Sequence, residues 1–204
     1  MVVTQAVCPP PAGRGPGGRS RVMDNGAVTS ELQIDPVRAA DPADARFHVC
    51  VVCTGNICRS PIGEQVLRRA IEEAGLADRV VVSSAGTGNW HVGSGAHDGS
   101  VRVLEEAGYP TEHTARQLTR TDLAGIDLVL AADRDHRALV KRMLAEPERD
   151  KVRLLRDFDP DADGDEIPDP YYGPHQGFVD VLDMTEAAMP GVIDEIRRRL
   201  ADRG

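Results

Sequence analysis

Four short runs of apolar and β-branched residues divide the chain beyond residue 46, and each run is typical of a buried strand. They are FHVCVV (47–52), VVVSSAG (80–86), DLVLAA (127–132) and VRLL (152–155). Between and after them, apolar residues recur at helical spacing over 60–75, about 100–110, about 135–144 and most of 174–202. Strands that alternate with helices predict an α/β fold with a parallel sheet covered on both faces.

The ends of the predicted helices carry recognisable signals. Ser60 suits the N-cap of the first helix, Pro61 suits its first turn, and Gly75 suits its end. The long final helix contains Pro190, where we expect a bend. In parallel sheets ligands bind beyond the carboxyl ends of the strands, and Cys53 lies at one such end.

Residues 1–46 lack this periodicity and are rich in Pro, Gly, Ala, Arg and Asp. Such a segment buries too little apolar surface to offset its chain entropy, so we expect a disordered N-terminal extension. A docking or regulatory tail is the alternative. The remaining residues, 47–204, are enough for one domain with a buried core.

The composition narrows the possible partners and location. The net charge of −9 disfavours nucleic acid and acidic membrane surfaces as partners. The chain has neither an apolar stretch of about 18 residues nor the apolar core of a signal peptide. We therefore expect a cytoplasmic protein without a membrane partner.

The sequence CTGNICRS (53–60) has the features of an anion-binding loop between a strand and a helix. Gly55 permits a close backbone approach, and Asn56 tolerates left-handed geometry. Arg59 offers a planar fork for two phosphate oxygens. The Ser60 hydroxyl can donate a hydrogen bond to Cys53, so the loop would stabilise a nucleophilic thiolate inside a phosphate-shaped cup.

Other uses of the cysteines are less well supported. Cys50 and Cys53 have the CxxC spacing of a zinc or thioredoxin-like site, but no second ligand pair follows, and Cys50 lies within a strand as a core residue would. Cys58 lies in the loop near Cys53. We expect that these two form a reversible disulfide, which would protect the nucleophile from further oxidation.

A proton donor is expected in the segment EIPDPYYGPHQGF (166–178). Asp169 precedes Pro170, which holds the chain extended, and Tyr171 and Tyr172 follow. The tyrosines either wall a slot for an aromatic leaving group or pack against the last helix. The acidic stretch 159–166 imitates a calcium loop, but Pro170 replaces the glutamate that such a loop needs at its twelfth position.

Five segments together resemble the low-molecular-weight protein tyrosine phosphatases. They are VCTGNICRSP, SSAGTGNW, TEHTARQLT, DLVLAAD and DPYYG, and the resemblance runs from about Phe47 to Leu200. It implies a three-layer α/β domain with a four-stranded parallel sheet flanked by helices. It also implies catalysis without a metal or other cofactor, through a phosphocysteine intermediate.

The resemblance also implies the roles of individual residues. Cys53 would be the nucleophile, Arg59 the phosphate clamp and Asp169 the general acid, while His113 would orient the loop asparagine. Trp90 would flank the substrate slot; core packing is its alternative role. The residues expected to bind phosphate and ring, directly or by supporting the loop, are Thr54, Gly55, Asn56, Ile57, Cys58, Ser60, Trp90, Tyr171 and Tyr172.

The expected substrates are tyrosine-phosphorylated proteins, and phosphate or other oxyanions should bind in the loop. A thioredoxin-coupled arsenate reductase would need further cysteines, and none follows Cys58. Protein arginine phosphatases carry Thr where this chain has Ile57, whose apolar side chain favours an aromatic ring. A phosphate-recognition module or thiol sensor is a third alternative, but it would not need Asp169.

Overall fold

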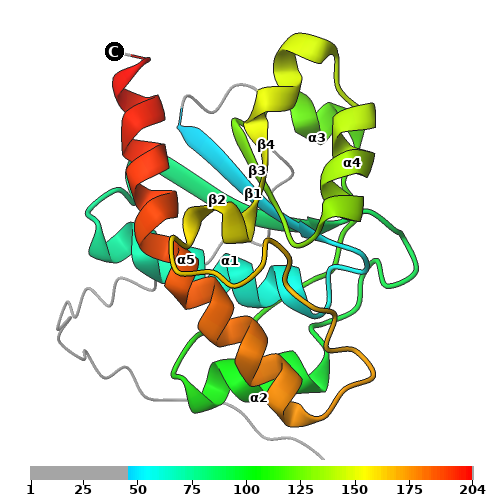
Figure 1. Cartoon of the computed structure of the whole chain (residues 1–204). Coiled ribbons are helices and arrows are strands. Elements are labelled where there is room, and N and C mark those ends of the chain that lie inside the picture. The colour runs from blue at the N-terminus through cyan, green and yellow to red at the C-terminus, as the bar shows by residue number, and fades with distance from the viewer. Residues whose placement is uncertain (1–45, 204) are drawn as a thin grey trace, which may run out of the picture. The chain divides into compact units, whose positions relative to one another are not determined.

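The computed structural model of the chain describes residues 46–203. This range includes the predicted domain except for its last residue (Figure 1). The expectation of a disordered extension over 1–46 falls, apart from Arg46, outside the described residues and stays a prediction.

Four parallel strands form the central sheet, as predicted. They are β1 (Phe47–Cys53), β2 (Val80–Gly86), β3 (Leu128–Ala131) and β4 (Val152–Leu154). Their order across the sheet is β2-β1-β3-β4. Every residue of β1 is buried, because this strand has a neighbour on each side and helices on both faces.

Helices cover both faces of this sheet (Figure 1). The α-helices are α1 (Arg59–Glu73), α2 (Asp98–Glu106), α3 (Arg120–Ala124), α4 (Arg134–Arg142) and α5 (His175–Ala201), and two 3₁₀ helices are η1 (Glu146–Lys151) and η2 (Leu155–Phe158). α1, α2 and α5 pack together on one face, and α3 and α4 lie on the other. Sequence periodicity missed α3, which is too short to show any and is stabilised instead by a capping box of Thr119 and Asp122.

Alternate side chains of β1 enter two separate cores. Val49, Val51 and Cys53 belong to the larger core beneath α1 and α5, whereas Cys50 and Val52 belong to the core beneath α3 and α4. Burial raises the pKa of the Cys50 thiol to about 11. Cys50 is a core residue, as the sequence predicted. The raised pKa means that its thiol is protonated.

The ends of the helices match the sequence signals only in part. Gly75 follows the last turn of α1 with a φ of 69°, as predicted. The prediction of Ser60 as the N-cap is wrong, because α1 begins at Arg59 with Cys58 in the N-cap position. Pro190 lies inside α5. Figure 1 shows that this helix changes direction about half-way along, in agreement with the predicted bend.

The topology creates a crevice at the carboxyl ends of β1 and β3. These strands are neighbours, but the helices that follow them, α1 and α4, lie on opposite faces. The loops after the two strands therefore diverge and leave room between them. Thr54, Gly55, Ile57 and Cys58 of the first loop line a cavity, and Asp133 of the second contacts Arg59 from outside that lining.

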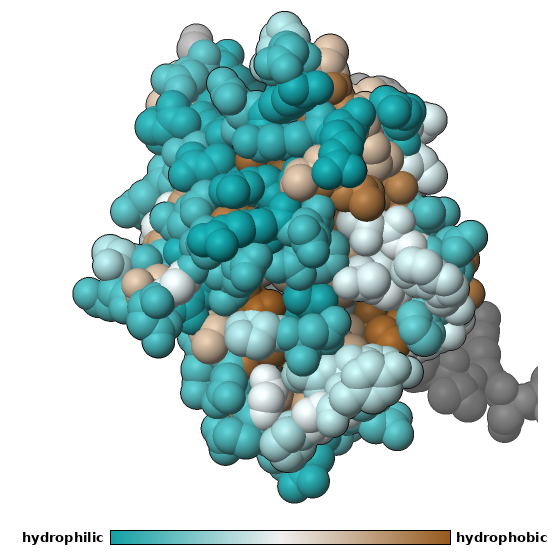
Figure 2. Space-filling model, turned by 45° about the vertical axis from the view of Figure 1, so that its right-hand side comes forward, coloured by the Kyte–Doolittle hydropathy of each residue, from teal (hydrophilic) through white to brown (hydrophobic). Residues whose placement is uncertain are grey.

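Within residues 46–203, no helix is both long and apolar enough to cross a bilayer. On the face seen in Figure 2, hydrophobic residues form small patches between hydrophilic ones.

Gly191 allows α5 to pack closely on η2, and its replacement should destabilise the domain. A Cβ at Gly191 would overlap the carbonyl oxygen of Phe158, a backbone atom that cannot rotate away. We expect Gly191→Ala to lower the free energy of unfolding by about 1–3 kcal/mol, measured by urea denaturation. Gly177→Ala in the same helix is the control. Its Cβ would make only an ordinary contact with Pro170, so it should be neutral or stabilise by up to about 1 kcal/mol.

Candidate active site

The loop after β1 turns sharply between the nucleophile candidate and α1. Asn56 has a φ of 57°, in the left-handed region that asparagine tolerates better than most residues. The end of β2 lies directly against this loop. A Cβ on Gly86 would lie only 2.8 Å from the carbonyl oxygen of Thr54, so glycine is required there.

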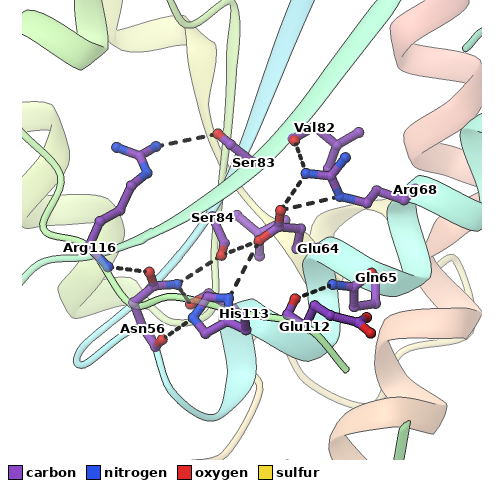
Figure 3. A network of polar contacts seen from close by, with 12 residues as sticks. Asn56, Glu64, Gln65, Arg68, Val82, Ser83, Ser84, Glu112, His113 and Arg116 are labelled. Atoms are coloured by element: carbon purple, nitrogen blue, oxygen red, sulfur yellow. Dashed lines mark hydrogen bonds and ion pairs between the residues drawn. The ribbon is translucent and has the colours of Figure 1, made fainter. Parts of the chain in front are cut away.

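The side chain of Asn56 is fully buried and joins three segments that are distant in sequence (Figure 3). Its Oδ1 accepts a hydrogen bond from the backbone N–H of Arg116 at 2.9 Å. Its Nδ2 donates to the hydroxyl oxygens of Ser60 at 2.9 Å and of Ser84 at 2.8 Å. The backbone N–H of Arg116 thus fixes which end of the amide faces the two serines.

This orientation determines where the two hydroxyl protons point. Because both serine oxygens accept from Asn56, each is free to donate its own proton elsewhere. Ser84 donates to the buried carboxylate of Glu64 at 2.6 Å. Ser60 lies 3.0 Å from Sγ of Cys53, so its proton points to the sulfur and stabilises negative charge there.

His113 supports the loop from behind. Burial lowers its pKa, while the hydrogen bond to the Asn56 carbonyl and the charge of Glu64, 3.9 Å from Nδ1, oppose this effect only partly. Its Nε2–H donates to that carbonyl at 2.6 Å. The sequence predicted that His113 orients this asparagine, and the structure places the contact on the backbone of Asn56.

Arg59 is 5% exposed and is held on both sides of its guanidinium group. Nη1 donates to Oδ2 of Asp133 at 2.9 Å and to the carbonyl of Ile167 at 3.1 Å. Nη2 donates to Oδ2 of Asp169 at 2.8 Å. The buried Nε–H has no hydrogen-bond partner among the described residues, as expected of a group that donates to an anion.

Asp169 reaches the site from the segment between η2 and α5. Pro168 and Pro170 flank it and restrict the backbone on both sides. Its Oδ1 accepts the backbone N–H of Tyr171 at 3.2 Å, and about half of its side chain is exposed. A carboxyl group beside both Arg59 and solvent can exchange a proton with a ligand.

These groups surround a cavity of about 370 Å³. Trp90 (73% exposed) and Tyr172 (96% exposed) lie at its rim, and the ring of Tyr172 meets that of Tyr171 edge-on at 4.7 Å. Trp90 is thus exposed, not packed in the core. The lining residues are Cys53, Thr54, Gly55, Ile57, Cys58, Arg59, Trp90, His91, Asp169, Tyr171, Tyr172 and Gly173.

Three predicted site residues, Asn56, Ser60 and His113, lie behind the loop and do not line this cavity. Cys58 lines the cavity as a protonated thiol, because burial, together with the nearby Cys53 and Asp169, raises its pKa to about 12. The predicted disulfide between Cys53 and Cys58 stays a hypothesis.

Sequence reasoning assigned no role to Asp133, Glu64, Ser84 or His91. Asp133 ends the quoted segment DLVLAAD, but its contact with Arg59 depends on β3 lying next to β1. Glu64 has the i,i+4 spacing to Arg68 that usually marks an exposed ion pair, yet it is buried. Only the arrangement of the strands and loops reveals these roles.

A parallel α/β sheet with a buried cysteine, a following arginine and an anion-binding loop defines a cysteine-dependent phosphatase. The chain belongs to the low molecular weight phosphotyrosine protein phosphatase family, whose family model matches residues 48–202. The resemblance noted in the sequence, the fold class and the enzyme class are thereby confirmed.

Individual relatives agree with this membership. The low molecular weight protein-tyrosine-phosphatase of Streptomyces coelicolor is 48% identical over 161 residues, which cover 77% of this chain and 98% of the relative. A protein tyrosine phosphatase from Entamoeba histolytica, solved with Hepes in the active site, has a TM-score of 0.72 and 31% identity, covering 74% of this chain and 97% of that one. Wzb of Vibrio vulnificus, solved with benzylphosphonate, has a TM-score of 0.63 and 27% identity, covering 73% and 98%.

Two replacements of Asn56 should separate the effect of its side-chain hydrogen bonds on stability from the effect of its positive φ. Asn56→Ala leaves the backbone N–H of Arg116 without its partner and places alanine at a positive φ. We expect a loss of about 2–4 kcal/mol in the free energy of unfolding, measured by urea denaturation. Asn56→Gly removes the same hydrogen bonds but tolerates the φ, so it should be more stable than the alanine variant by about 1 kcal/mol. Equal stability of the two variants would contradict this account.

Proposed function

We propose that this protein hydrolyses phosphotyrosine in proteins in two steps, through a phosphocysteine on Cys53 and with Asp169 as general acid. The observation that carries the proposal is the position of three groups around one cavity. These are a sulfur that accepts a hydrogen bond from Ser60, a clamped arginine whose Nε–H has no partner among the described residues, and a half-exposed carboxyl group.

In the first step the thiolate of Cys53 attacks phosphorus, and the bond from phosphorus to the tyrosyl oxygen breaks. The proton of Asp169 passes to that oxygen, so tyrosine leaves as a neutral phenol. Arg59 and the loop N–H groups hold the equatorial oxygens of the transition state. Ser60 stabilises the thiolate before the attack.

In the second step the carboxylate of Asp169 takes a proton from water. The water oxygen attacks phosphorus, the sulfur–phosphorus bond breaks, and inorganic phosphate leaves. Cys53 returns as a thiolate and Asp169 returns protonated. Besides the substrate, the proposed steps use side chains and backbone N–H groups of the protein and one water molecule.

The contact between Arg59 and Asp169 links substrate binding to this chemistry. Nη2 of Arg59 donates to Asp169 in the structure. In the proposed complex a phosphoryl oxygen takes over this N–H, which separates Asp169 from its cation. A carboxyl group beside an anion favours its protonated form, which is the form that general acid catalysis requires.

The walls of the cavity support an aromatic substrate. Tyr171, Tyr172 and Trp90 present ring surface at the entrance, and Ile57 adds an apolar side chain to the lining. Benzylphosphonate, the ligand in the structure of Wzb, joins an aromatic ring to a phosphonate, as phosphotyrosine joins a ring to a phosphate. Particular protein substrates, and the expected cytoplasmic location, stay predictions.

Comparison of two phosphorylated substrates tests the proposed function. We expect kcat/KM on a phosphotyrosine peptide to exceed that on a phosphoarginine protein by at least about 10-fold, because Ile57 favours a ring over a guanidinium group. Both assays contain EDTA, and the phosphotyrosine activity should be unaffected by it. Preference for phosphoarginine would overturn the substrate assignment, and binding of the phosphopeptide without turnover would overturn the catalytic one.

Variants of the two reacting residues test the mechanism. Cys53→Ser should abolish turnover, and Asp169→Asn should lower kcat/KM on phenyl phosphate, which reports the first step alone, by about 10²–10⁴-fold. The loss should be smaller on p-nitrophenyl phosphate, whose leaving group needs less protonation. Asp165→Asn is the matched control, because this carboxylate pairs with Arg134 in the acidic turn, outside the cavity lining. An equal loss on both substrates would argue against Asp169 as the acid.

A further inference from the structure

A buried histidine that the proposed mechanism does not use lies next to the arginine clamp. His136 is 5% exposed and occupies the first turn of α4. Its Nε2 lies 2.8 Å from the hydroxyl oxygen of Thr54, in the loop after β1. Its Nδ1 lies 2.7 Å from Oδ1 of Asp133, which also accepts the backbone N–H of His136 at 2.8 Å.

Both contacts of the imidazole lead to the guanidinium group of Arg59. Asp133 uses its other oxygen, Oδ2, to accept from Nη1 at 2.9 Å. The Thr54 hydroxyl oxygen accepts from Nη2 at 3.4 Å. His136, Asp133, Arg59 and Thr54 thus form a closed ring of contacts, in which the imidazole is the only group that touches neither the cavity nor Arg59.

The charges in this ring indicate where its protons lie. Burial alone would raise the pKa of Asp133, but the hydrogen bonds from His136 and the charge of Arg59 outweigh it and lower the pKa. Asp133 is therefore a carboxylate, and lone pairs on Oδ1 and Nδ1 would repel at 2.7 Å, so Nδ1 carries the proton. Nε2 on the other side of the ring faces the Thr54 hydroxyl, whose oxygen also accepts from Arg59.

We propose that His136 is a positioning residue of the active site, which fixes the plane of the Arg59 guanidinium group through Asp133 on one side and Thr54 on the other. The inference rests on the proposed function of Arg59 as the phosphate clamp. A planar fork serves the transition state only when its orientation is fixed in advance, and the arginine side chain has several rotatable bonds. Loss of the fixed plane should weaken transition-state binding more than substrate binding.

Two substitutions separate the two contacts of the imidazole. The amide nitrogen of Asn lies as many bonds from Cβ as Nδ1 of His does, so His136→Asn keeps a donor for Asp133 and loses the contact with Thr54. The amide group of Gln lies as many bonds from Cβ as Nε2 of His does and offers both an acceptor oxygen and a donor nitrogen, so His136→Gln keeps a contact with Thr54 and loses that with Asp133. We expect each variant to lower kcat on the phosphotyrosine peptide by about 10-fold and to change KM less than about threefold. Ki for orthovanadate, which forms a planar equatorial set of oxygens on the cysteine, should rise about as much as kcat falls.

Addition of Thr54→Val to each background tests whether His136 acts through this contact. In wild type and in His136→Gln, Thr54→Val should lower kcat by a further several-fold. In His136→Asn, where the contact is already lost, it should cost little. A histidine that only fills space in the fold would give equal losses in all three backgrounds.

A matched control and a check of folding complete the experiment. His175→Asn changes a histidine that pairs with Glu106 away from the cavity, so its kcat and KM should equal those of wild type. Urea denaturation shows which His136 variants fold; the loss of kcat can be measured in either one, and the comparison of Thr54→Val between backgrounds uses His136→Asn. Absence of wild-type turnover would overturn the proposed function itself. An active wild type with His136 variants of unchanged kcat, or with losses confined to KM, would overturn only the role of His136.

Discussion

The chemistry of the active-site loop depends on the orientation of one buried amide, the side chain of Asn56. The backbone N–H of Arg116 fixes its oxygen, so its NH₂ group must face both serines. If the amide were flipped, its NH₂ group would face the backbone N–H of Arg116, and two donors would lie opposite each other in a site that water does not reach. The direction of the Ser60 proton toward Cys53 is thus decided by a loop more than 50 residues away in the sequence. The environment of the Cys53 sulfur is therefore set by the folded domain and not by its loop alone.

A second constraint is the balance of charge around Arg59. One cation faces two carboxylates, and these differ in exposure: about 22% for the Asp133 side chain and 50% for that of Asp169. The more buried partner is held by further hydrogen bonds and is a fixed anchor. Asp169, the more exposed partner, lies on a loop between two prolines, and a ligand can replace it as the acceptor of the Nη2–H of Arg59. This asymmetry lets the same arginine be rigid at Nη1 and exchange partners at Nη2.

The sequence predicted those parts of the molecule whose signals are local. Buried strands appear as apolar runs, and the loop from Cys53 to Ser60 contains its nucleophile, turn residues and cation in one segment. Contacts such as Arg59 with Asp133 depend on β3 lying next to β1, which no local pattern encodes. The failure at Ser60 is instructive. Its hydroxyl suits an N-cap by residue type, but Asn56 occupies its oxygen and directs its proton to sulfur.

The ring of Tyr171 at the cavity and the loop after β1 are held by the same two helices, α2 and α5. The backbone N–H of His97, at the N-cap of α2, donates to the carbonyl of Ile57 in the active-site loop at 2.8 Å. The ring of His97 stacks on Phe178 of α5 at 5.1 Å and lies 5.3 Å from the ring of Tyr171. Tyr171 in turn donates its backbone N–H to Asp169. Asp169, the ring of Tyr171 and the loop after β1 are therefore linked through α2 and α5, so in the proposed mechanism a substrate ring placed against Tyr171 lies next to the proposed proton donor.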